Sequence, residues 1–162
     1  MDYLWSPWRF RYVSQANKDG GCVFCEKIKL DPSKDREHLV LYRGKCNLLL
    51  LNLFPYTTGH TMVIPYQHVG DLVNLDPETL AEMMTLARRT QAALADVYKP
   101  EGYNLGMNLG KCAGAGVAEH VHMHILPRWS GDSNFMTVIG ETRVQPEELL
   151  TTYDKLVDHF GR

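Results

Sequence analysis

A stretch of alternating histidines at residues 120–127 constrains the fold of this chain more than any other feature. It reads His-Val-His-Met-His-Ile-Leu-Pro. Successive side chains of a β-strand point to opposite faces. His120, His122 and His124 would therefore line one face at steps of roughly 6.6–6.8 Å, while the intervening Val, Met and Ile face the core. The pattern predicts a strand that packs on a core through one face, is stopped at Pro127, and presents three imidazoles on the other face.

The chemistry of this imidazole row depends on its surroundings. A histidine array at neutral pH can bind a metal, move protons or act as a nucleophile; the alternative is an exposed polar face of the strand. The preceding loop, residues 110–116, combines small residues with Gly110, Gly114 and Gly116. Such a backbone can turn its N–H groups inward to bind an anion, and Lys111 adds a positive charge. Although the loop alone could be an ordinary connection, a nest beside an imidazole favours chemistry at phosphorus.

The remaining pattern predicts an α+β fold with a roughly five-stranded, mainly antiparallel sheet. Apolar runs between turn signals predict strands at residues 38–43, 46–52, 60–65, 103–109 and 121–126. Asp76 as N-cap and Pro77 at the first helical position open one long helix, which residues 99–102 end. A short helix at residues 22–30 and a C-terminal helix at residues 146–160 complete the prediction.

Length and charge narrow the class of protein. A chain of 162 residues suits one domain. No apolar run approaches the roughly 20 residues of a membrane span, and the N-terminus lacks the apolar core of a signal peptide. A net charge of −2 argues against a dedicated nucleic-acid binder. We therefore expect a cytoplasmic protein with reduced cysteines and neither a membrane nor a nucleic-acid partner.

A cysteine pair marks a candidate metal site. Cys22 and Cys25 have the spacing of zinc ligands, and His68 and His120 are candidates for the other two positions. Four protein ligands would make the zinc structural, with no open coordination position. The alternative is a pair of buried or reduced thiols; a thioredoxin-like redox pair is disfavoured because no βαβ context surrounds it.

The histidine stretch resembles the motif of the histidine triad (HIT) superfamily, His-φ-His-φ-His-φ-φ with φ apolar, at every position of residues 120–126. Residues 59–65 and 104–108 resemble two further strand motifs of that family. Together these segments cover roughly residues 22–130. Residues 4–9 and the segment after Pro127 resemble the bacterial branch that includes diadenosine tetraphosphate phosphorylases and hydrolases.

The resemblance implies a mechanism. His122 would attack the α-phosphorus of a dinucleoside polyphosphate such as diadenosine tetraphosphate and form a nucleotidyl-histidine, which phosphate or water then resolves. His124 would hydrogen-bond the transferring or leaving phosphate, and His60 would support the triad from a neighbouring strand. Zinc-bearing branches of the family imply the same metal ligands as the spacing, His120 among them. No organic cofactor is implied.

Substrate contacts are expected from several segments. Asn108, Lys111 and the backbone at Gly114 and Gly116 would bear the phosphate charge. Members of the family often carry Ser, Thr or Gln just before the triad, whereas this chain has Gly-Val-Ala-Glu at residues 116–119. The candidates for the base and ribose pocket are Phe24, Ile28, Leu51, Asn52 and Phe54. For Leu51 taken alone, packing in the core is the favoured interpretation. Trp129 and Phe135 would stack on a second base or cover a partner subunit.

The whole chain, residues 1–162, is expected to form a single HIT-like domain. It would comprise an aromatic N-terminal arm (1–21), the HIT core (22–130) and a C-terminal extension with a helix (131–162). The family implies a homodimer in which the sheet continues across both subunits. Alternative functions are an adenosine phosphoramidate hydrolase, a zinc hydrolase with the triad as ligands, and a non-catalytic nucleotide-binding module stabilised by zinc.

Overall fold

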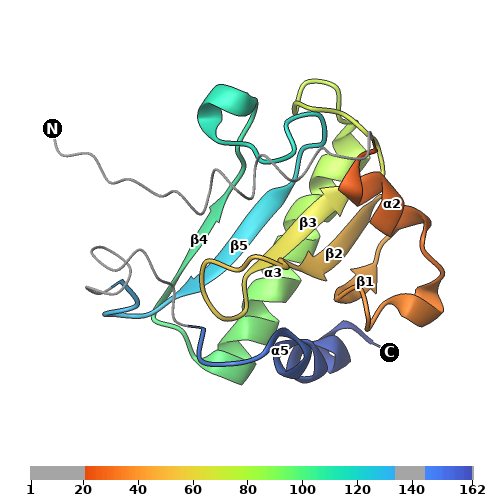
Figure 1. Cartoon of the computed structure of the whole chain (residues 1–162). Helices are drawn as coiled ribbons and strands as arrows, with labels where there is room; N and C mark the ends of the chain where they lie inside the picture. The colour runs from red at the N-terminus through yellow and green to blue at the C-terminus, as the bar shows by residue number, and fades with distance from the viewer. Residues whose placement is uncertain (1–20, 134–144, 162) are drawn as a thin grey trace, which may run out of the picture.

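The structure, a computed structural model, describes residues 21–133 and 145–161, and its five strands form one antiparallel sheet (Figure 1). The strand order is β1-β2-β3-β5-β4. The strands are β1 (Val40–Arg43), β2 (Asn47–Leu51), β3 (Thr61–Pro65), β4 (Gly102–Gly106) and β5 (Met123–Arg128). The predicted α+β architecture is confirmed. The aromatic arm up to residue 20, and Phe135, lie outside the described residues.

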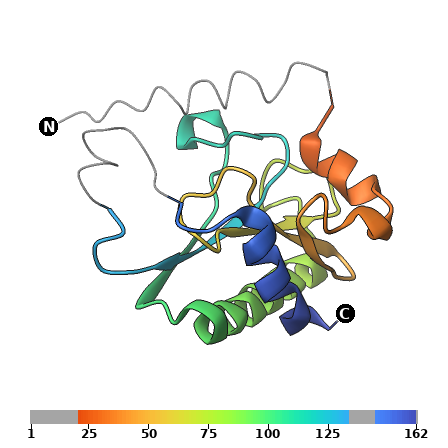
Figure 2. The same cartoon turned by 60° about the horizontal axis from the view of Figure 1, so that its bottom comes forward.

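Both faces of the sheet are covered at strand β2, where every residue is buried. Leu49 and Leu51 point into the larger core, which packs against the long helix α3 (Pro77–Tyr98). Leu48 and Leu50 point the other way, into a smaller core that contains Phe24 from the short helix α2 (Val23–Lys29). Figure 2 shows α3 along one side of the sheet and α2 on the other.

Helix α3 begins as the sequence predicts. The Asp76 carboxylate accepts a hydrogen bond from the Thr79 backbone N–H at 2.8 Å, and Pro77 occupies the first turn. Further along, the Glu82 carboxylate accepts from the backbone N–H groups of Lys45 and Cys46, both at 2.7 Å. One side chain of α3 thereby fixes the turn between β1 and β2. No helix in the described ranges is long and apolar enough to cross a membrane.

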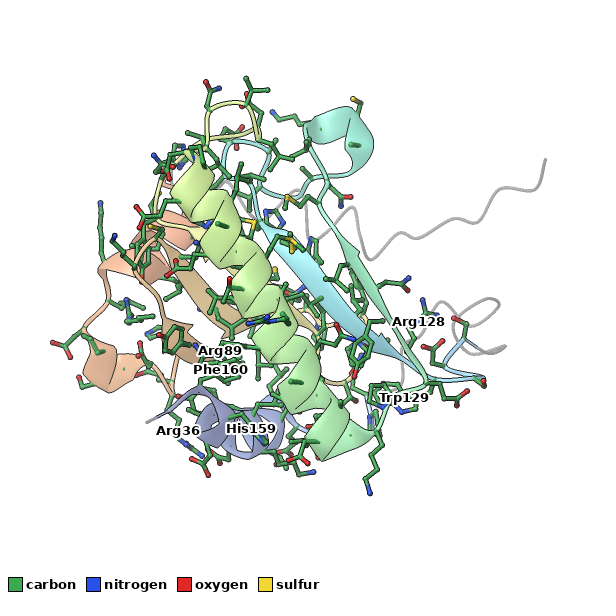
Figure 3. All side chains as sticks on the ribbon, turned by 180° about the vertical axis from the view of Figure 1, so that it is seen from behind. Arg36, Arg89, Arg128, Trp129, His159 and Phe160 are labelled. Carbon is green, nitrogen blue, oxygen red and sulfur yellow. The ribbon has the colours of Figure 1, made fainter. Side chains whose placement is uncertain are left out.

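The C-terminal helix packs against α3 (Figure 3). It consists of α5 (Leu149–Leu156) and a tighter 3-10 turn, η3 (Val157–Phe160), so it begins three residues after the predicted start at residue 146. The Arg89 guanidinium of α3 lies 4.6 Å from the ring centroid of Tyr42 and 5.4 Å from that of Phe160. This cation–π contact joins the end of the chain to β1 and α3.

Strand β5 differs from the prediction at both ends. It begins at Met123, two residues later than expected, and it continues through Pro127, where a stop was expected. The Pro127 carbonyl accepts a hydrogen bond from the Thr57 hydroxyl at 3.2 Å, beyond the first residue of β3, Thr61. The missing N–H of the proline would point the same way, where no ladder partner exists. The proline therefore costs the sheet no hydrogen bond.

Candidate active site

The three triad histidines lie at the start of β5 and in the turn before it. Val121, Met123 and Ile125 are buried in the core against α3, as the alternation predicts. His120 and His122 are buried on the other side, with 0% and 6% of their surface exposed. His124 is half-buried. The alternation of faces is thus kept although only His124 belongs to the regular strand.

His122 is held as a neutral imidazole with one defined proton. Its Nδ1 lies 2.9 Å from the backbone carbonyl of His120, and since a carbonyl only accepts, Nδ1 must donate. The lone pair is then on Nε2. Burial lowers the pKa of His122, and the hydrogen bond to His120 offsets part of this effect. The Phe24 ring, 4.9 Å away between centroids, packs against the imidazole. A buried, neutral ring with a defined lone pair can act as a nucleophile.

His124 is held in the opposite tautomer through His60. The backbone N–H of Tyr56 donates to His60 Nδ1 at 3.0 Å, so the proton of His60 is on Nε2. His60 Nε2 lies 2.9 Å from His124 Nδ1 and must donate to it. The proton of His124 is therefore on its Nε2. We call these two residues the His60–His124 pair.

The two tautomers give the site complementary groups. His122 offers a lone pair on Nε2, whereas His124 offers an N–H, and their ring centroids are 4.8 Å apart. Sequence reasoning identified His60 but missed Tyr56, whose contribution is a backbone N–H that no residue pattern marks. The Tyr56 ring also lies nearly parallel to the His124 ring, at 6.1 Å.

Four potential metal ligands converge beside the triad, and we call them the Cys–His cluster: Cys22, Cys25, His68 and His120. Their ligand atoms all lie within 4.8 Å of one another. The three sulfur–nitrogen distances Cys22–His120, Cys25–His68 and Cys25–His120, and the distance between the Nδ1 atoms of His68 and His120, are 3.2–3.6 Å. A tetrahedral zinc site with bonds of about 2.0–2.3 Å has edges of about 3.3–3.8 Å. The predicted residues are thus brought together with the geometry of a metal site.

His120 is prepared for metal binding by its second nitrogen. Its Nε2 donates to the Pro65 carbonyl at 2.8 Å, so the lone pair is on Nδ1, the atom that faces the cysteines. Burial lowers the pKa of His120, which favours the neutral, ligating form. Burial and the neighbouring Cys22 raise the pKa of the Cys25 thiol, so a cation is what would favour its thiolate.

The glycine-rich loop is held in place by Asn108, whose side-chain N–H donates to the Gly114 carbonyl at 3.3 Å. Gly110 and Gly114 have φ angles of 83° and 89°, a region that favours glycine. Lys111 is exposed and Gly116 half-buried. Asn108 therefore acts on the loop itself, and its predicted contact with phosphate stays a prediction.

The candidates for the base pocket separate into two groups. Phe24 lies against His122, and Asn52 lies beside His60, with its amide nitrogen 3.3 Å from His60 Nδ1. Leu51 belongs to the core against α3, so the structure argues against its expected contact with a base. The reason is the alternation along β2, which places Asn52 and Leu51 on opposite faces. Trp129 follows the far end of β5 (Figure 3). Five residues of extended strand separate it from His124 by about 16 Å.

An antiparallel sheet that carries a buried histidine in one tautomer between two histidines in the other tautomer defines a histidine triad protein. The HIT domain family model matches residues 33–131, and the chain belongs to the HIT family. An AP-4-A phosphorylase of Mycobacterium tuberculosis is 37% identical over the whole of this chain and 86% of its own length. An asymmetrical bis(5'-nucleosyl)-tetraphosphatase of Schizosaccharomyces pombe is 38% identical over 57% of this chain and half of its own length.

Solved structures agree with this assignment. A zinc-bound histidine triad family protein from Mycobacterium smegmatis superposes with a TM-score of 0.67 and 29% identity, over 86% of this chain and 92% of that protein. A histidine triad nucleotide-binding protein from Sulfolobus tokodaii superposes with a TM-score of 0.66 and 27% identity, over 85% and 91% of the two chains.

Proposed function

We propose that this protein cleaves dinucleoside polyphosphates such as diadenosine tetraphosphate at the α-phosphate, through a covalent nucleotidyl intermediate on His122. The observation that carries the proposal is the pair of opposite tautomers at the site: a lone pair on His122 Nε2 next to an N–H on His124 Nε2. The phosphorylase of M. tuberculosis, which aligns with the entire chain, supports this choice of substrate.

In the first step His122 Nε2 attacks the α-phosphorus. A P–N bond forms, the bond from phosphorus to the bridging oxygen breaks, and ATP leaves with the electron pair of that bond. His122 becomes a nucleotidyl-imidazolium whose proton stays on Nδ1 and is donated in a hydrogen bond to the His120 carbonyl. His124 Nε2–H hydrogen-bonds the phosphate oxygens as negative charge develops, which stabilises the transition state more than the ground state.

In the second step an acceptor oxygen attacks phosphorus and forms the new P–O bond. The P–N bond breaks, its electron pair returns to His122 Nε2, and the proton of the acceptor is released to solvent. Phosphate as acceptor yields ADP, whereas water yields AMP. The relative named as a phosphorylase favours phosphate, and the one named as a tetraphosphatase favours water. Asn52, Phe24 and the glycine-rich loop with Lys111, Gly114 and Gly116 are proposed to hold the nucleotide during both steps. Trp129, at the far end of β5, is proposed to stack on the second base of the substrate or to cover a partner subunit.

The Cys–His cluster is proposed to bind a structural zinc ion. The fit of its distances to a tetrahedron and the zinc-bound relative support this assignment. Zinc would supply folding stability here, because four protein ligands leave no position for a substrate oxygen or water. His120 would thus be a ligand, and not a group that touches substrate.

The organisation of the chain is also a proposal. Residues 1–162 would form one HIT-like domain that dimerises through the outer edge of β4 and neighbouring α3. Leu105 of β4 and Met84 of α3 are large apolar residues with 44% and 55% of their surface exposed, which supports a contact there. The cytoplasmic location expected from the sequence stays a prediction.

Product identification tests the proposed function. Purified protein is incubated with diadenosine tetraphosphate, with and without inorganic phosphate, and the nucleotides are separated by ion-exchange chromatography. The proposal predicts ATP in every productive reaction, accompanied by ADP when phosphate is the acceptor and by AMP when water is. An adenosine phosphoramidate, run in parallel, distinguishes the family's other activity; faster turnover of that compound, with no cleavage of the tetraphosphate, would overturn the proposal.

A further inference from the structure

The peptide group between Pro55 and Tyr56 is hydrogen-bonded through both its N–H and its carbonyl. Its N–H donates to His60 Nδ1 at 3.0 Å. Its carbonyl accepts a hydrogen bond from the Gln145 side chain at 3.2 Å. Gln145 comes from the segment before the C-terminal helix, 90 positions further along the chain. A side chain near the C-terminus thus contacts the same peptide that sets the tautomer of His60.

The orientation of this peptide determines what His124 presents. With the N–H toward His60, the proton of His60 is on Nε2 and that of His124 is on its Nε2. If the peptide turned over, its carbonyl would face His60 Nδ1 and would require a proton there. His60 Nε2 would then accept from His124 Nδ1, and His124 Nε2 would present a lone pair. A lone pair at that place repels phosphate oxygens, whereas an N–H binds them.

Gln145 is itself anchored by its neighbour Glu147. The Glu147 carboxylate accepts hydrogen bonds from the Tyr98 hydroxyl of α3 and, at 2.8 Å, from the Thr152 hydroxyl of α5. It also forms an ion pair with Lys155. These contacts fix the segment that carries Gln145 to both helices. The Gln145 amide is therefore held in position to donate to the Pro55 carbonyl.

We propose that Gln145 is a positioning residue, which holds the Pro55–Tyr56 peptide in the orientation that keeps an N–H on His124 Nε2. This inference rests on the proposed function for its effect on turnover, although not for its effect on the tautomers. Asn52 also donates toward His60 Nδ1, at 3.3 Å, and is the competing support for the same tautomer. The contributions of Gln145 and Asn52 can be distinguished, because Gln145 contacts the Pro55 carbonyl whereas Asn52 contacts His60 itself.

The test uses the full chain with two variants of similar size. Gln145→Met removes the donor, and Gln145→Glu places an acceptor against the Pro55 carbonyl. Glu148→Gln is the matched control, because Glu148 is exposed and makes no capping hydrogen bond at the start of α5. The first readout is the 15N NMR spectrum of the histidine rings, which separates protonated from unprotonated ring nitrogens. The second is kcat and KM on diadenosine tetraphosphate.

We expect both Gln145 variants to move the ring-nitrogen signals of His60 and His124 toward the other tautomer, with the larger change for Gln145→Glu. We expect kcat to fall about tenfold and KM to stay within about twofold. This is less than the effect on kcat of removing a donor that contacts the developing charge, about 10²-fold or more. Wild-type signals in both variants would overturn the proposal and assign the tautomer to Asn52. An equal loss in Glu148→Gln would also overturn it. Since the NMR readout needs no substrate, failure of this link and failure of the proposed function can be distinguished.

Discussion

The two ends of the triad hold their histidines in different ways. At one end His120 has both ring nitrogens committed to the fold, one to the Pro65 carbonyl and one to the Cys–His cluster. At the other end the His60–His124 pair passes a defined hydrogen-bond direction from the Tyr56 backbone to His124. His122 lies between them. Three identical residues at a spacing of two thus receive different roles from their partners alone, so changes at the two ends should have different consequences.

Removing the central imidazole has the largest expected effect. His122→Ala deletes the nucleophile, so turnover of diadenosine tetraphosphate should fall by about 10⁴-fold or more. Initial rates measured by product chromatography check this, with His159→Ala, an exposed histidine near Asp96, as control. Wild-type rates in His122→Ala would show that the middle histidine is not the reacting group.

Disrupting the Cys–His cluster should chiefly affect stability. Structural metal binding is part of the folding free energy, so removal of the ion by a chelator, or Cys25→Ala, should lower the free energy of unfolding by several kcal/mol. Metal analysis and thermal melting of both proteins measure this, with the exposed Cys112→Ser as control. If activity were lost at an unchanged melting temperature, the metal would be catalytic. The Cys–His cluster and the His60–His124 pair would then both serve catalysis, and the proposed difference between them would be wrong.

His124→Ala should show the reverse pattern. The variant loses an N–H at the developing phosphate charge, and we expect kcat to fall by about 10²-fold. The melting temperature should stay close to that of the wild type, because His124 is only half-buried. Kinetics and melting curves on one preparation separate the two effects; a large loss of stability would assign His124 to the fold, as for His120.

His60→Phe should have a smaller effect than His124→Ala. Phenylalanine keeps the ring but removes both nitrogens, so His124 keeps its place and loses only the donor to its Nδ1. We expect kcat to fall about tenfold, since a supporting hydrogen bond is lost and not the group that contacts phosphate. A loss as large as that of His124→Ala would mean that His60 itself touches the substrate.

Local patterns in the sequence predicted much of this arrangement. Alternation placed Val121, Met123 and Ile125 in the core, and the spacing of Cys22 and Cys25 led to a cluster that the structure assembles. Each of these patterns depends on a local rule, either the period of a strand or the reach of one helical turn.

What the sequence could not supply depended on partners distant along the chain. Leu51 is a candidate both for a base pocket and for the core, because nothing local says which face of β2 meets α3. Pro127 was expected to end its strand because the proline rule does not show that β3 has already ended there. The Tyr56 N–H and the Gln145 side chain were missed since a hydrogen bond to a backbone group leaves no pattern in the residues.

The covalent intermediate on His122 is the central claim, and trapping it is the most direct test. The protein is mixed with radiolabelled diadenosine tetraphosphate, without phosphate, quenched in base within seconds, and digested for mass spectrometry. The account predicts an acid-labile nucleotidyl group on the peptide that contains His122, and its absence from His122→Ala. A nucleotidyl group on another residue, or rapid turnover with no labelled protein at any quench time, would contradict the account.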